Sequence, residues 1–283
     1  MHEQTDSPAP HGEETPTVEP DGKEAALPTQ EVPSAPPTDE MTRDTVLADC
    51  PRRNWHPDPT ALLSFGEGEK PQGTEVFRAL RSRLCQLQRN SPLKSLLVTS
   101  ALEKEGRSFV ALNLAQVMAL QPECRVLLID GDLRDPKLHS MLGTDSSPGF
   151  TEYLKQEAEE FGVMQRGDAE NLFFIPSGGA VTTPTELIAN NRLKYLIAQV
   201  EPLFDWIIVD SPPAIRVSDA CLLANYCEGV LMVVRSQSTP FDVVQKARER
   251  FPEESLVGVI LNEISHKSKP PFWRRRHKPG SEE

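Results

Sequence analysis

The sequence predicts an α/β protein with a mostly parallel β-sheet that is flanked by helices on both faces. Apolar runs within 126–130 and 205–210 end abruptly in Asp130 and Asp210. A third apolar run, 95–100, leads through a short loop into a helical pattern. Such runs are typical of parallel sheets, because helices cover the strands on both sides. Strands that alternate with helices therefore indicate one sheet between two helical layers.

The remaining elements follow from hydrophobic periodicity along the chain. Apolar positions three and four residues apart predict helices, and short unbroken apolar runs predict strands. Right-handed crossovers are expected to join neighbouring parallel strands. The expected helices are 74–88, 109–120, a short stretch from 137 through 154, 185–200, 218–226 and 241–250. The expected strands are 95–100, 125–130, 171–175, 205–210, 229–235 and 255–262.

Both ends of the chain differ from this central region in composition. Residues 1–50 hold twelve Asp and Glu and eight Pro, but only two basic residues, Lys23 and Arg43. Such a segment buries too little apolar surface to offset the entropy lost on ordering. We therefore expect residues 1–60 to be a disordered acidic region. The folded domain is expected over 74–264, and a disordered basic tail over 265–283.

The charge, the hydropathy and the cysteines argue against a nucleic-acid-binding, membrane-spanning or disulfide-rich protein. The formal net charge is −12, most of it in the acidic N-terminal region, so nucleic-acid binding has no support. No segment is apolar over enough residues to cross a bilayer, and the N-terminus lacks the basic and apolar regions of a signal peptide. The five cysteines show no Cys-x-x-Cys spacing and are typical of buried thiols in a reducing compartment. A cytoplasmic location is expected.

Three aspartates stand at predicted strand ends. Asp130 and Asp132 follow one strand, and Asp210 ends another. Open α/β sheets bind ligands at the carboxyl edge of their strands, and carboxylates there can hold magnesium beside a nucleotide. The alternative is that each aspartate only caps the turn or helix that follows it.

The loop after strand 95–100 has the layout of a phosphate-binding P-loop. Gly106, Arg107 and Ser108 stand between the strand and the next helix, where backbone N–H groups cradle phosphate. The Ser108 hydroxyl would bind magnesium. Arg107 takes the place of the usual lysine. Its guanidinium is longer and fork-shaped, so the replacement is not conservative at so tight a site.

Three motifs in this order resemble those of bacterial tyrosine kinases of the capsule and exopolysaccharide type. These are cytoplasmic P-loop proteins related to the partition and division-site ATPases. The resemblance runs from about Thr74 to Ile264 and implies the P-loop nucleoside triphosphatase fold. Its motifs are Thr99-Ser100 through Gly106-Arg107-Ser108, then Leu128-Ile129-Asp130-Gly131-Asp132-Leu133-Arg134, then Ile208-Val209-Asp210-Ser211-Pro212-Pro213, with support from Ile175-Pro176-Ser177-Gly178-Gly179, Pro184-Thr185-Glu186-Leu187 and Gly258-Val259-Ile260-Leu261-Asn262.

The resemblance implies that the chain binds ATP and Mg²⁺. The implied nucleotide-binding residues are Gly106, Arg107, Ser108 and Asn262, and the implied metal-binding residues are Ser108, Asp130 and Asp210. Asp130, Asp132 and Arg134 are the implied catalytic residues. One of the two aspartates would accept the proton of an incoming tyrosine. Arg134 would steady the developing charge or pair with Asp132.

The resemblance also implies assembly at a membrane. Glu75, Arg78 and Arg81 are similar to the family's Glu-x-x-Arg-x-x-Arg oligomerisation helix, so a homo-oligomer is expected. The implied partner is a membrane polysaccharide co-polymerase or adaptor protein. The basic and aromatic tail suits an anionic membrane surface or an acidic partner, and the alternative is a solvated end. These features lead us to expect a peripheral position at the inner face of the plasma membrane.

The chain departs from the family pattern in its P-loop and in its tyrosines. Lys104 replaces a glycine where the loop is expected to need a positive φ, which costs a non-glycine residue about 1–2 kcal/mol. The family's C-terminal tyrosine cluster is missing, since none of the three tyrosines lies beyond Tyr226. Weak or no self-phosphorylation is therefore expected.

Three functions remain open. The first is an ATP-dependent protein-tyrosine kinase that regulates polysaccharide biosynthesis and export. The second is a catalytically weakened nucleotide-binding regulator of the same system. The retained Asp130, Asp132 and Asp210 favour the first, and Arg107 favours the second. A partition-type ATPase is the third, but Leu102 stands where that group has its signature lysine.

Overall fold

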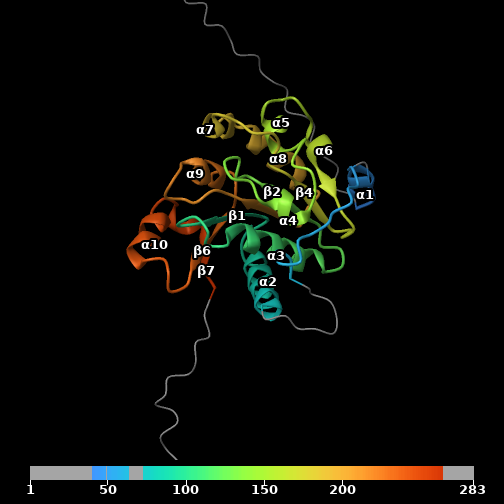
Figure 1. The fold of residues 1–283 in the computed structure, drawn as a ribbon. Coiled ribbons are helices and arrows are strands. Elements are labelled where there is room, and N and C mark those ends of the chain that lie inside the picture. Colours follow the sequence, from blue (N-terminus) through green and yellow to red (C-terminus); the bar gives the residue numbers. More distant parts are fainter. Residues whose placement is uncertain (1–39, 49, 64–72, 264–283) are drawn as a thin grey trace, which may run out of the picture. The chain divides into compact units, whose positions relative to one another are not determined.

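The computed structural model describes residues 40–48, 50–63 and 73–263 and confirms the predicted fold class (Figure 1). In this part of the chain a seven-stranded sheet has the order β3-β4-β2-β5-β1-β6-β7, and only the β3–β4 pair is antiparallel. The strands are β1 (Ser95–Ser100), β2 (Val126–Asp130), β3 (Gln165–Arg166), β4 (Leu172–Ile175), β5 (Trp206–Asp210), β6 (Gly229–Arg235) and β7 (Leu256–Asn262).

Helices cover both faces of this sheet (Figure 1). They are α1 (Glu40–Ala48), α2 (Thr74–Gln88), α3 (Arg107–Ala119), α4 (Leu138–Leu142), α5 (Phe150–Leu154), α6 (Glu160–Val163), α7 (Pro184–Ile188), α8 (Arg192–Val200), α9 (Asp219–Ala224) and α10 (Phe241–Arg248), with a 3₁₀ turn at Glu253–Ser255. No helix in the described ranges has the length and apolar character needed to span a membrane.

Two apolar cores form because successive strand residues point to opposite faces of the sheet. On β1, Leu96 and Val98 pack into the core that contains α2, α3 and α4. Leu97 packs into the opposite core, with α5, α7, α8 and α9. The central strands are buried along their whole length, which explains their unbroken apolar sequence.

The predicted elements are present, but left-handed residues interrupt two of the predicted helices. The helix expected over 185–200 is divided into α7 and α8, because Asn191 between them adopts a left-handed conformation with φ 62°. The stretch expected from 137 through 154 forms two helices, and Gly143 ends the first at φ 63°. The short strand β3 and helix α6 were not predicted, because two to four residues give no periodic pattern.

The prediction of disorder through residue 60 is wrong for its last third. Residues 40–48 form α1. Leu47 is buried in one apolar core and Trp55 in the other, and Ala61 is also buried. These apolar side chains are sparse among charged neighbours, so their burial was not visible in the composition. Residues 1–39 and the predicted basic tail, 265–283, lie outside the described residues.

Residues 50–63, termed here the N-terminal strap, are fixed on the face that carries α3. The Trp55 ring packs edge-on against Phe174 with centroids 6.3 Å apart, and its Nε1 donates to Gln165 Oε1 at 3.1 Å. The buried Asn113 of α3 holds the other end of the strap. Its Nδ2 donates to the Ala61 carbonyl at 2.9 Å, and its Oδ1 accepts from the Leu63 N–H at 2.7 Å.

Replacement of Asn113 should release the strap from α3. Asn113→Ala leaves the Leu63 N–H and the Ala61 carbonyl without this partner, so we expect the free energy of unfolding to fall by roughly 1–3 kcal/mol. Urea denaturation followed by tryptophan fluorescence measures the change. The exposed Asn90→Ala is the matched control and should stay within about 0.5 kcal/mol of the parent protein. Equal stability of the two variants would contradict this role of Asn113.

Candidate active site

The order of the strands brings the predicted motifs to one edge of the sheet. β5 lies between β2 and β1, and Asp130 at the end of β2 stands opposite Asp210 at the end of β5. On the other side of β5, β1 runs into the loop that starts α3. Parallel strands present their carboxyl ends at a common edge, so the loop and the aspartates converge there.

The P-loop, residues 101–106, is shaped by two left-handed residues. Lys104 has φ 60° and Gly106 has φ 86°. The prediction that Lys104 occupies a position with positive φ is confirmed. A Cβ on Gly106 would be strained at this φ and would lie 2.1 Å from Asn262 Nδ2, so a larger residue would have to displace the Asn262 side chain. The loop therefore keeps one glycine where contact is closest and tolerates a strained lysine at its tip.

Glu105 anchors this loop to the neighbouring strand. Its carboxylate is buried and accepts from the N–H groups of Leu102 at 2.6 Å and Arg235 at 3.1 Å, and from the Thr239 hydroxyl. Asn262, predicted from the resemblance to lie near the nucleotide base, donates from Nδ2 to the Glu105 carbonyl at 2.9 Å. Asn262 thus supports the backbone of the P-loop from β7.

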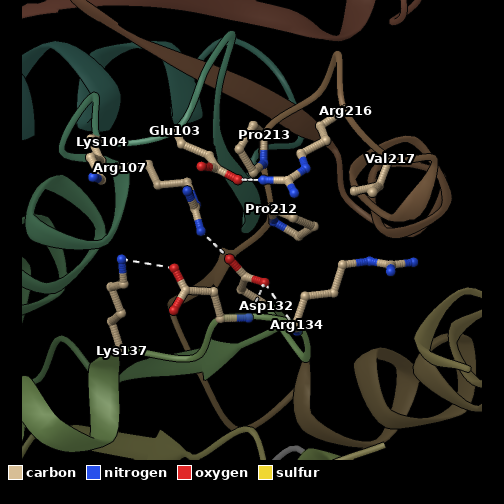
Figure 2. A pocket seen from close by; sticks show the side chains of 11 residues that line it. Glu103, Lys104, Arg107, Asp132, Arg134, Lys137, Pro212, Pro213, Arg216 and Val217 are labelled. Carbon is tan, nitrogen blue, oxygen red and sulfur yellow. Dashed lines mark hydrogen bonds and ion pairs between the residues drawn. The ribbon is translucent and has the colours of Figure 1, made fainter. Parts of the chain in front are cut away.

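Arg107 lies between the P-loop and the aspartates (Figure 2). Its side chain is 8% exposed and forms an ion pair with Asp132, and its Nε lies 3.7 Å from Asp210 Oδ1. A buried guanidinium is stable only when carboxylates compensate its charge. The residue at the usual lysine position is therefore already paired with two of the predicted site residues.

Asp130 and Asp210 are fully buried and close to each other. Burial raises the pKa of the Asp130 carboxyl well above its ordinary value, and the carboxylates of Asp210 and Asp132 raise it further. The N–H groups of Leu138 and Asp132 donate to Asp130 at 3.1 and 3.3 Å. Burial also raises the pKa of Asp210 to about 6, although the guanidinium of Arg107 opposes the rise. Both carboxyls therefore need positive charge beside them, from Arg107 or a bound cation, to stay ionised.

These residues fit a magnesium-bound nucleotide. Both carboxylate oxygens of Asp210 are buried without a well-formed hydrogen bond among the described residues. Burial raises the pKa of Asp210 and the nearby Ser108 hydroxyl lowers it, so both groups face the place where a cation or its bound water would sit. Ser108 lies at the start of α3, next to Arg107. The described part of the chain holds no group of three Asp, Glu, His or Cys side chains placed to bind a metal without help. Phosphate oxygens and the Ser108 hydroxyl would have to complete the coordination.

The cavity above the P-loop is lined by five cationic and three acidic side chains, the latter being Glu103, Asp132 and Asp135. It measures about 470 Å³, and its cationic side chains are Lys104, Arg107, Arg134, Lys137 and Arg216. At its rim Arg216 forms an ion pair with Glu103 of the loop (Figure 2). A wall of this charge favours an anionic ligand such as a polyphosphate.

Of the two roles expected for Arg134, the structure does not form the pairing with Asp132. The Arg134 guanidinium instead bonds to Asp219, from Nε to Oδ2 at 2.7 Å and from Nη2 to Oδ1 at 3.2 Å, and to Thr185 Oγ1 at 2.8 Å. The hydrogen bond between Arg134 and Asp132 runs instead from the Arg134 backbone N–H to Asp132 Oδ1, at 3.2 Å. Sequence reasoning missed Asp219, because an aspartate in the first turn of a helix is usually a solvated residue that favours the helix dipole.

The predicted oligomerisation residues lie on α2, apart from this site. Arg78 pairs with Glu75 at 2.7 Å on the same helix. Arg81 donates from Nη1 to the Val117 carbonyl of α3 at 2.9 Å, so it braces the helix that begins at the P-loop. The neighbouring Val76 is 68% exposed, which leaves an apolar side chain beside the charged pair.

Comparison with known proteins decides the family. Tyrosine-protein kinase YwqD of Bacillus subtilis is 32% identical over 195 residues, which are 68% of this chain and 82% of that protein. This chain belongs to the bacterial tyrosine-protein kinases. Tyrosine-protein kinase CpsD of Streptococcus agalactiae is 31% identical and is likewise covered over 82% of its length. The longer tyrosine-protein kinase ptk of Acinetobacter johnsonii is covered over only 27%. No family model matches the chain.

Solved structures of kinase domains agree with this membership. The kinase domain of the Escherichia coli tyrosine kinase ETK superposes with a TM-score of 0.63 at 28% identity, over 69% of this chain and 78% of that one. The chimerical protein CapA2B2 gives 0.64 at 25% identity, over 78% and 98%. The septum site-determining protein MinD of Pyrococcus horikoshii, complexed with Mg-ADP, shares only the fold, with 0.54 at 20% identity.

The tyrosines of this kinase-family chain are held in the structure to different degrees. Tyr153 is buried, and burial raises the pKa of its phenol to about 12. Its hydroxyl donates to the Arg192 carbonyl at 3.3 Å, and the Tyr226 hydroxyl donates to Asn191 Oδ1 at 2.6 Å. Tyr195 is 40% exposed on α8.

Asp210 should make the stability of the protein depend on pH. Because its pKa is about 6 in the folded protein and 3.8 when unperturbed, the folded state holds the proton more tightly. The ionised carboxylate therefore destabilises the fold most above pH 6 and less as the pH falls toward 4. We expect Asp210→Asn to raise the free energy of unfolding by roughly 2–3 kcal/mol at pH 8 and by about half as much at pH 5.

Denaturation of both proteins across this pH range tests the expectation. The exposed Asp242→Asn on α10 is the matched control and should show no pH-dependent difference. A gain from Asp210→Asn that did not change with pH, or a loss of stability at pH 8, would contradict it.

Proposed function

We propose that this chain is an ATP-dependent protein-tyrosine kinase that regulates capsular or exopolysaccharide biosynthesis and export. One observation carries the proposal. The carboxylates of Asp132 and Asp210 lie against Arg107 of the P-loop helix, and Asp130 stands opposite Asp210 at the same edge of the sheet. The kinase names of the relatives support the reaction class.

The P-loop residues would hold the nucleotide. Mg-ATP supplies the phosphoryl group, and the metal neutralises its charge. Gly106 and the loop N–H groups are placed to bind the phosphates, and Ser108 and Asp210 to bind or orient magnesium. Arg107 must turn from Asp132 toward the phosphates, since one guanidinium cannot neutralise both.

Asp132 would then serve as the general base. Freed from Arg107, its carboxylate can accept the phenolic proton of a tyrosine in an acceptor protein. Asp130 stays tied to the backbone N–H groups of Leu138 and Asp132, which fix the loop that carries the base. Arg134 would contribute positive charge at the edge of the cavity while Asp219 holds it in place.

A catalytically weakened regulator is the second candidate. The buried Arg107–Asp132 pair favours it, because the ion pair neutralises both the phosphate-binding cation and the general base. In either case we propose a homo-oligomer formed through Glu75, Arg78 and Arg81. It would act with a membrane polysaccharide co-polymerase or adaptor at the inner face of the plasma membrane.

Arg107→Lys should tighten nucleotide binding. The lysine ammonium is compact and can reach the phosphates without orienting a planar guanidinium. It also pairs less strongly with the Asp132 carboxylate than arginine does. We expect the Kd for ATP with magnesium to fall by roughly tenfold, about 1.4 kcal/mol. Calorimetry with and without magnesium measures it, with the exposed Arg89→Lys as control. Unchanged or weaker affinity would show that Arg107 is already accommodated.

Phosphate transfer to a foreign tyrosine tests the proposed kinase reaction. With Mg-ATP and a copolymer of glutamate and tyrosine, we expect phosphate on the copolymer and little on the chain itself. Asp132→Asn should lower the rate by at least about 100-fold, because the general base is lost. Asp242→Asn is the control. Mass spectrometry that found stoichiometric phosphate on Tyr153, Tyr195 or Tyr226, lost in Asp132→Asn, would contradict the expectation of weak self-phosphorylation.

A further inference from the structure

Arg216 and Glu103 form an exposed ion pair at the rim of the nucleotide cavity (Figure 2). Glu103 belongs to the P-loop, and Arg216 belongs to the loop that joins β5 to α9. The Arg216 side chain is 69% exposed and the Glu103 side chain 51%. An exposed pair stabilises the fold little, because water and salt screen its attraction. The pair can therefore open when a ligand enters the cavity.

The backbone on either side of Arg216 is fixed. Before it, the N–H of the buried Ala214 donates at 2.8 Å to the carbonyl of Ser100, the residue at which β1 ends and the P-loop begins. After it, the buried Asp219 is held in place by its ion pair with Arg134. An exposed side chain on a fixed backbone can change partners without moving the loop that carries it.

The other arginines of the cavity are less free to change partners. Arg107 is 8% exposed and paired with Asp132, which is 2% exposed, so its departure leaves a buried carboxylate uncompensated. Arg134 donates two hydrogen bonds to Asp219, at 2.7 and 3.2 Å. Arg216 is thus the arginine of this cavity that a ligand can recruit with the smallest loss of existing contacts.

A polyphosphate over the P-loop would change the balance of charge at the exposed pair. Glu103 stands on the loop that the phosphates approach, and like charges repel each other. The Arg216 guanidinium, in contrast, would gain a stronger partner, because phosphate is an anion that accepts two parallel N–H bonds from arginine. Glu103 and the phosphates therefore compete for one arginine.

We propose that Arg216 binds the phosphates of the nucleotide, and that Glu103 holds it at the rim of the cavity until the nucleotide arrives. The assignment rests on the nucleotide site of the proposed kinase function. Arg216 meets the phosphates from the rim, whereas Arg107 lies on the buried side of the cavity. Arg216 follows Pro213, the end of the third sequence motif, by three residues, so the motifs did not indicate it.

Substitution of both members of the pair tests the assignment. The probe is a non-hydrolysable ATP analogue with magnesium, and calorimetry measures its Kd for the full chain. We expect Arg216→Gln to raise this Kd by about tenfold, because a charge-assisted bond to phosphate is lost. Glu103→Gln should lower the Kd by roughly threefold, because the competing carboxylate is gone. Arg248→Gln breaks the exposed pair with Glu253 on α10 and is the matched control, with a change of less than about twofold.

The double variant separates phosphate binding from simple neutralisation of Glu103. If Arg216 only masked the charge of Glu103, its replacement would have no effect once residue 103 is glutamine. We expect instead that Arg216→Gln raises the Kd by about tenfold in the Glu103→Gln background as well. Arg216→Lys keeps the positive charge and should stay within about threefold of the parent protein.

Three results would overturn the assignment. The first is that Arg216→Gln binds the analogue like the parent protein. The second is that the effect of Arg216→Gln disappears in the Glu103→Gln background, and the third is that the parent protein does not bind the analogue.

Phosphate transfer to the copolymer of glutamate and tyrosine, measured alongside, keeps this assignment distinct from the proposed function. A parent protein that transfers phosphate, with normal binding of the analogue by Arg216→Gln, would retain the kinase function and lose the assignment. A parent protein that transfers none, but binds the analogue through Arg216, would retain the assignment and lose the kinase function.

Discussion

The buried ion pair between Arg107 and Asp132 is the interaction on which the site depends. Three carboxylates meet at the carboxyl edge of the sheet, and two of them have raised pKa values because burial disfavours their charge. A guanidinium is the only side-chain cation that the described structure places among them. The same residue is needed to bind phosphate. Any ligand that recruits Arg107 must therefore replace the positive charge that it withdraws, and a divalent cation bound with the nucleotide does so.

The polar groups around this pair have hydrogen-bond or ion-pair partners, so the unfavourable burial of charge is concentrated at Asp210. Glu105 and Asn262 hold the P-loop backbone from β6 and β7, and Asp219 holds Arg134. The buried Asp210 carboxylate, in contrast, has no well-formed hydrogen bond in the described residues and only loose contacts with Ser108 and Arg107. A folded chain tolerates such a group where function requires it, because the unfavourable energy is recovered when the ligand binds.

The fold was predictable from sequence because its signals are local and strong. Unbroken apolar strands such as 126–130, ending in aspartate, indicate a parallel sheet whatever lies around them. The P-loop was predictable for the same reason, down to the positive φ of Lys104. Asp219 and Thr185 were not, because only the fold brings them to Arg134, 85 and 51 residues away in the chain. The N-terminal strap was missed because its few apolar anchors, such as Trp55, stand in a polar segment.

Arg134 lines the nucleotide cavity, and Asp219 fixes its position there. Had it paired with Asp132, the second of the two roles expected from the resemblance, it would compete with Arg107 for that carboxylate. Asp219 instead draws the guanidinium aside, so Asp132 has one cationic partner, and nucleotide binding can remove that partner. The base would then become available only after the phosphates have engaged Arg107.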